Sequence, residues 1–158
     1  MYWESALSSA AQVGIGLAGF SGVVAALRSE RDSWSESDQL NLQVLLGASG
    51  WAILFSLIPF AALDLLPTRI AWNVLSAIYL MVFLGISTFR VIQYRRGGIS
   101  KGLMRRVLIG TAPIAILLLA NSVVVGVPWP YVAVVVWQLV NAFLAFVRLL
   151  RVSSDGAV

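Results

Sequence analysis

Five stretches of this chain are each long and apolar enough to cross a bilayer as a helix: residues 5–27, 38–63, 69–94, 103–125 and 130–152. A membrane-spanning helix needs about 20 mostly apolar residues. Only 11% of the 158 residues are charged, whereas soluble domains average about 25%. We therefore predict an all-α, polytopic transmembrane bundle of five helices, which forms a single domain over residues 1–158.

Basic residues divide unevenly between the two ends of these predicted helices. Arg69 alone lies at one end, and the other ten Lys and Arg lie at the opposite end. The positive-inside rule then predicts that the N-terminus is outside and the C-terminus is cytoplasmic. We expect a multi-pass protein of the cell membrane, and short loops and small size favour the bacterial inner membrane. The first apolar segment lacks a preceding basic stretch, so we expect it to remain as a span.

Aromatic residues agree with this orientation. Those expected at the outer boundary are Tyr2, Trp3, Trp72, Trp129 and Tyr131. Tryptophan and tyrosine favour membrane interfaces because one end of each side chain is apolar and the other is polar. We therefore predict an outer aromatic belt.

Small residues form two stripes at helical spacing along the first predicted helix. One stripe is Ala10, Gly14, Ala18, Gly22 and Ala26, and the other is Ser8, Gln12, Gly16 and Gly19. Helices in lipid associate through close backbone approach, which small residues permit. We therefore predict that this helix is central and packs on both sides. Either both stripes pack within one chain, or one of them packs against a second subunit.

Neutral polar residues are the other notable feature of the spans. No Asp, Glu, Lys or Arg lies in the middle of a predicted span, which argues against a proton-driven transporter or pump. The polar candidates are Gln12, Asn73, Asn121, Ser122, Gln138 and Asn141. They either line a polar path or form hydrogen bonds between helices. Pro59 and Pro113 lie inside predicted helices and mark either static kinks or hinges.

A basic turn joins the third and fourth predicted helices. Its members are Arg95, Arg96, Lys101, Arg105 and Arg106. Such clusters bind anionic lipid headgroups in some membrane proteins, and in others they only determine topology. Both interpretations of this turn remain open.

Enzymatic chemistry has little support in the sequence. Cysteine and histidine are absent, which removes thiolate chemistry, imidazole ligands and the commonest general base. The glycines at 14, 16 and 19 match a dinucleotide-binding spelling, but they lie in an apolar span with no preceding strand. We predict no catalytic residue, no metal, no cofactor and no nucleic-acid partner. A membrane-bound lipid enzyme, using the acidic residues between 30 and 38, is the least favoured alternative.

The leading functional hypothesis is a non-enzymatic component that acts by helix packing within a membrane complex. It rests on the uncharged spans and the small-residue stripes. We expect the lipid bilayer and further membrane subunits, or other copies of this chain, as partners. The alternative is a small homo-oligomeric channel or facilitator with a neutral polar path.

Overall fold

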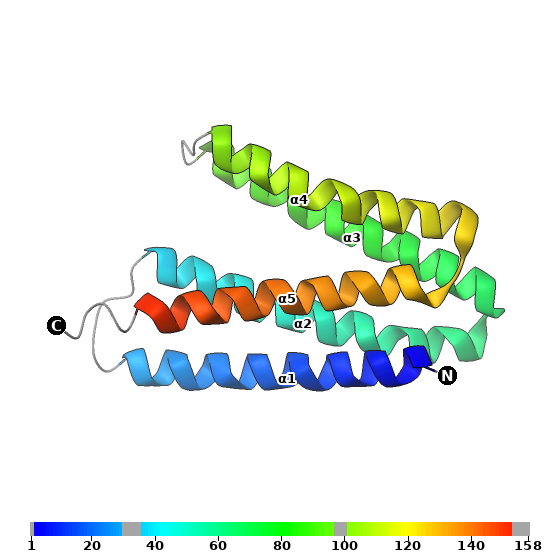
Figure 1. The fold of residues 1–158 in the computed structure, drawn as a ribbon, viewed down its shortest axis with the longest axis horizontal. Coiled ribbons are helices and arrows are strands. Elements are labelled where there is room, and N and C mark those ends of the chain that lie inside the picture. The colour runs from blue at the N-terminus through cyan, green and yellow to red at the C-terminus, as the bar shows by residue number, and fades with distance from the viewer. Residues whose placement is uncertain (1, 30–35, 97–100, 153–158) are drawn as a thin grey trace. The chain divides into compact units, whose positions relative to one another are not determined.

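The computed structural model describes residues 2–29, 36–96 and 101–152, and side chains within these ranges except at 27–29, 36–38, 89–90, 93–96, 101–109 and 151–152. The described residues form α1 (Tyr2–Ser29), α2 (Glu36–Leu65), α3 (Thr68–Arg96), α4 (Lys101–Ala120), the π-helix η1 (Asn121–Val125) and α5 (Pro128–Val152), with no strand among them (Figure 1). The prediction of an all-α bundle is confirmed. Each helix boundary lies within a few residues of its predicted position.

Within the part of the chain that the structure describes, four helices are long and apolar enough to cross a membrane. They contain the segments Tyr2–Ala26, Gln39–Leu65, Thr68–Thr88 and Pro128–Leu150, with mean hydropathies between 1.4 and 2.0. The apolar part found in α4 and η1, Gly110–Val125, is shorter. The protein is therefore an integral, multi-pass membrane protein. Its orientation, inferred from charge, remains a prediction.

The chain divides into two compact units. Unit 1 comprises Met1–Ile58 and Val135–Val158, and unit 2 comprises Pro59–Val134. The division falls within α2 at Pro59 and within α5 at Val135, so both helices contribute to both units. Unit 1 also contains α1, and unit 2 also contains α3, α4 and η1.

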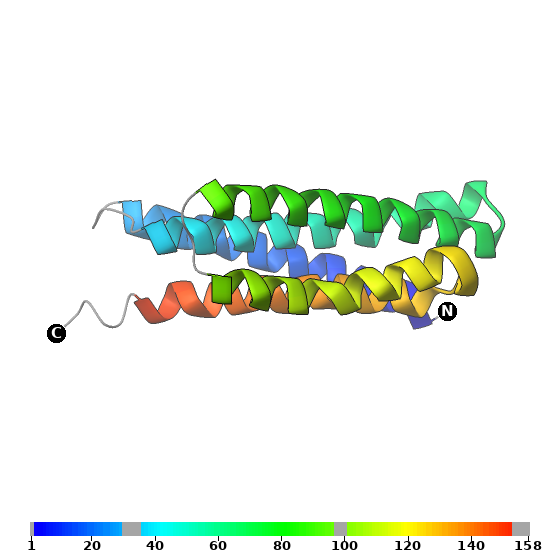
Figure 2. The same ribbon diagram turned by 90° about the horizontal axis from the view of Figure 1, so that it is seen from above.

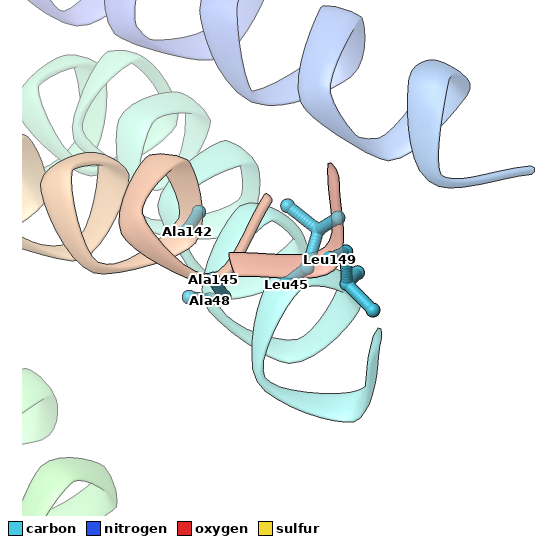
Figure 3. Packing of buried hydrophobic residues seen from close by; sticks show 5 residues of the cluster. All are labelled: Leu45, Ala48, Ala142, Ala145 and Leu149. Atoms are coloured by element: carbon cyan, nitrogen blue, oxygen red, sulfur yellow. The ribbon is translucent and has the colours of Figure 1, made fainter. Parts of the chain in front are cut away.

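Small side chains bring α2 and α5 close together in unit 1. Leu45 and Ala48 of α2 face Ala142, Ala145 and Leu149 of α5, and all five are buried (Figure 3). Three of these five residues are alanines, which let the backbones approach as membrane-helix packing requires. Leu45 and Leu149 complete this buried cluster.

The Gly14 side of α1 contacts α2. A Cβ atom built on Gly14 would lie 2.8 Å from Ile53 Cγ1 and 3.3 Å from the Ser49 carbonyl oxygen. Only a residue without a side chain fits so close to the neighbouring helix without displacing it. Gly14 is thus an internal packing residue of unit 1.

In unit 2, α3 packs along α4, and η1 continues α4 against α3 (Figure 2). Trp72 and Tyr79 of α3 enclose Tyr131 of α5, with edge-on ring contacts at centroid distances of 5.6 and 5.3 Å. Edge-to-face pairs of this kind add to the stabilisation from burial.

This aromatic cluster corrects part of the belt prediction. Trp3, Trp72 and Tyr131 were expected at the lipid interface, but all three are buried in the structure, Trp72 and Tyr131 completely. Trp129 and Tyr2 are exposed, as an interfacial belt requires. Position along a helix predicts depth in the membrane, but it does not predict which side of the helix faces inward.

Candidate functional site

The first small-residue stripe of α1 winds from the buried side of the helix to the exposed side. Ala10 and Gly14 are buried, Ala18 is half-buried, and Gly22 and Ala26 are exposed. Residues four apart in an α-helix are offset by about 40° around its axis. Over this stripe the offsets accumulate, so its two ends lie on nearly opposite sides. Only the beginning of the stripe packs within unit 1.

The second stripe of α1 is exposed along its length. We call its residues Ser8, Gln12, Gly16 and Gly19 the open face of α1, and all four are exposed. Among the described residues, no heavy atom outside the backbone of α1 itself lies within 4 Å of a Cβ built on Gly16, Gly19 or Gly22. Among the described residues of unit 1, the opposite side of α1 makes the packing contacts and the open face makes none. Whether the open face packs within one chain or against a second subunit remains a prediction.

The open face differs in composition from other exposed faces in unit 1. Exposed positions on α2 and α5 include Leu54, Leu57, Phe143 and Leu144, which are typical lipid-facing side chains. The open face brings a serine, a glutamine and two glycines together on one side, flanked by the exposed Ile15 and Val23. On α2, Gln43 and Gly50 are exposed among these larger apolar side chains. An amide side chain exposed on a membrane helix has no hydrogen-bond partner in lipid tails, and that is energetically unfavourable. The composition therefore suits contact with another helix better than contact with lipid.

A second candidate lies in unit 2, where Asn121 joins three segments of the chain. Its Nδ2 donates to Ser76 Oγ at 2.7 Å and to the Val127 carbonyl at 3.0 Å. Its Oδ1 accepts from the Val127 backbone N–H at 3.1 Å. Asn121 is completely buried, as is Ser76. We call this set of bonds the Asn121 clasp, which ties the start of η1 and the residue before α5 to α3.

The turn beside the clasp depends on a glycine. Gly126 has a left-handed backbone with φ 62° and ψ 45°, and its N–H donates to the Asn121 carbonyl at 3.0 Å. A Cβ at this position would collide with Asn73 Oδ1 and with Arg69. Nearby, Arg69 Nη2 donates to the Val124 carbonyl at 3.1 Å. Backbone conformation and close approach therefore both favour glycine here.

The predicted polar residues are not brought together as one set. Asn121 forms the clasp, and Asn73 lies next to Gly126 in the adjoining turn. Ser122 donates to the Leu119 carbonyl, three residues earlier in the chain, at 2.8 Å. Asn141 similarly donates to the Trp137 carbonyl at 2.9 Å. Gln12 is exposed and Gln138 is half-buried, and these two lie with Asn141 in unit 1. A continuous polar path therefore remains a prediction.

The structure says less about the other candidate residues, which are the basic turn and the two prolines inside helices. The basic-turn side chains at Arg95, Arg96, Lys101, Arg105 and Arg106 lie outside the described residues. Pro59 and Pro113 lie inside α2 and α4, as predicted. Across the described ranges, no three His, Cys, Asp or Glu side chains gather as metal ligands would.

Sequence reasoning missed the contributions of Arg69 and Gly126. Arg69 entered the prediction only as the one basic residue of its side, yet its guanidinium group holds the Val124 carbonyl. Gly126 follows an apolar helix and precedes Val127-Pro128, which is a common signal for a helix end. That pattern predicts the left-handed glycine but not the contact with α3.

Comparison with known proteins adds no relationship to this geometry. No protein-family model, no curated protein and no solved structure matches the chain.

Proposed function

We propose that this protein is a non-enzymatic component of a membrane complex, and that the open face of α1 binds a transmembrane helix of a partner subunit. The observation that carries the proposal is the exposure of Gln12, Gly16 and Gly19 on one side of a membrane-spanning helix. The glycines leave room for a second backbone, and Gln12 offers both a donor and acceptors at the same contact.

The opposite side of α1 supports this assignment. Leu7, Ala10 and Gly14 are buried in unit 1, so this side already holds the helix in the fold. The open face is not needed for that contact. A helix with one face packed and the other small and polar is suited to joining two subunits. Binding through such a face needs no reaction chemistry, which agrees with the lack of cysteine and histidine.

The test is to enlarge the open face and measure assembly. Gly16→Leu and Gly19→Leu should each reduce association with the partner, because the added side chain holds the backbones apart. The matched control is Gly85→Leu on α3. Gly85 is also exposed, and in the described ranges no heavy atom outside the α3 backbone lies within 4 Å of a Cβ built there. All three variants should therefore fold.

Protein extracted in a mild detergent, followed by native mass determination, measures the outcome. The proposal predicts that the two α1 variants lose mass relative to the wild type, whereas Gly85→Leu retains the wild-type mass. If both α1 variants keep the complete assembly, the open face is not the binding surface. If the mass that is lost is a multiple of this chain, the partner helix comes from a second copy.

A further inference from the structure

The last residues of η1 and the turn that follows them expose apolar side chains at the tip of a helical hairpin. We call residues 123–127 the valine turn. Val123 is 71% exposed and Val124 is 64% exposed, and Trp129 follows with 55% exposure. A loop that reaches water is normally polar, because loops carry solvent-exposed backbone and side chains. The composition of this turn is instead typical of a surface that contacts lipid.

Charge is absent from the whole hairpin that carries the turn. No Asp, Glu, Lys or Arg occurs between Arg106 and Arg148. Gly126 follows Arg106 by 20 residues and precedes Arg148 by 22 residues. At about 1.5 Å per residue each limb is about 30 Å long, which matches the hydrocarbon core of a bilayer. The positive-inside rule predicts that both arginines lie on the cytoplasmic side. The turn then reaches the opposite edge of the core and extends little beyond it.

Side chains form hydrogen bonds with backbone groups of the valine turn that have no partner within a helix. Both backbone polar groups of Val127 bond to the Asn121 side chain. The Val124 carbonyl accepts from Arg69 Nη2. In water these partners are dispensable, because water can bond to an exposed turn. In lipid, a backbone group without an internal partner costs several kcal/mol.

Proline removes further backbone donors at the start of α5. The first four N–H groups of a helix have no partner within that helix. Pro128 and Pro130 occupy two of these positions and carry no N–H group. Fewer unpaired donors therefore remain at the end of the hairpin, which again lowers the cost of contact with lipid.

We propose that the valine turn lies inside the membrane, just beneath the headgroup phosphates, with Val123 and Val124 in contact with lipid. Arg69 marks the boundary, because a guanidinium group at this depth reaches the headgroup region while it donates to Val124. Trp129 lies at the same level, as tryptophan does at membrane interfaces. The occupant of this apolar surface is the bilayer itself.

Single-cysteine spin labelling tests the proposal directly, because the wild-type chain has no cysteine. Val123→Cys and Val124→Cys are labelled in purified protein reconstituted into phosphatidylcholine and phosphatidylglycerol vesicles. Val140→Cys on the exposed side of α5 serves as the lipid-contact control. Spin-labelled lipids of known label depth provide the scale. The measured quantity is the ratio of collision rates with oxygen, which concentrates in lipid, and with a water-soluble nickel chelate.

The proposal predicts that oxygen collisions exceed nickel collisions at positions 123 and 124, at a depth between the headgroup standard and Val140. Nickel collisions that exceed oxygen collisions at both positions would overturn it, because the turn would then lie in water. Low collision rates with both reagents would also overturn it, because the turn would then be covered by another copy of the chain. Because the valines are exposed, cysteine replaces them without disturbing internal contacts.

Discussion

Replacing Asn121 should destabilise unit 2 more than replacing any other asparagine in a membrane span. Asn121→Leu keeps a similar side-chain volume but removes all three bonds of the clasp. The Ser76 bond alone is worth about 0.6–1.7 kcal/mol in a membrane protein. Each Val127 backbone group left without a partner costs at least about 1 kcal/mol. We therefore expect the free energy of unfolding to fall by about 3–5 kcal/mol.

Two controls separate the clasp from a general effect of losing an amide. Ser76→Ala removes one of the three bonds and should cost about 1 kcal/mol. Asn141→Leu removes only a bond to the Trp137 carbonyl of its own helix and should change stability by about 0.5 kcal/mol or less.

Reversible unfolding by sodium dodecyl sulfate in mixed micelles, followed by tryptophan fluorescence, provides the free energies. The predicted order of destabilisation is Asn121→Leu, then Ser76→Ala, then Asn141→Leu. If Asn121→Leu costs no more than Asn141→Leu, the clasp does not hold the turn to α3, and the reasoning is refuted.

Two further predictions concern glycines. Gly14→Ala should lower the free energy of unfolding by about 1–3 kcal/mol, because its Cβ would overlap Ile53. Gly16→Ala should leave the free energy of unfolding unchanged or raise it by up to about 1 kcal/mol. If both variants matched the wild type in the same unfolding assay, the α1–α2 contact would be disproved. Gly126→Ala should lower the thermal unfolding temperature in detergent. A left-handed backbone costs an alanine about 1–2 kcal/mol, and its Cβ would also meet Asn73. An unchanged unfolding temperature would contradict the observed turn.

Hydropathy predicts the helices of this chain well and their facing sides poorly. A run of apolar residues long enough to span a bilayer allows little other than a helix, because lipid offers no hydrogen bonds to the backbone. The two ends of each helix follow from polar residues, proline and glycine. Trp72 shows the limit of hydropathy-based prediction. Its position near a helix end predicts a ring at the membrane interface, but the rotation of the helix buries the side chain.

The candidate sites show the same difference between sequence spacing and packing. The stripe from Ala10 to Ala26 reads as one surface in sequence, yet the helical offset carries its later members away from α2. The polar residues Asn121 and Asn141 resemble each other in sequence, but one joins three segments and the other bonds to its own helix. Contacts between distant residues, such as Asn121 with Ser76, depend on helix rotation and on the turn at Gly126. The residue pattern along a single helix predicts neither the rotation of that helix nor the turn.

The most direct test of the account is the native mass of the wild-type protein, extracted from its own membrane in a mild detergent that preserves membrane complexes. The account predicts a mass well above the 17.1 kDa of one chain, because the open face of α1 is occupied by a partner helix. A mass of one chain, with its bound lipid and detergent only, would contradict a role in a membrane complex.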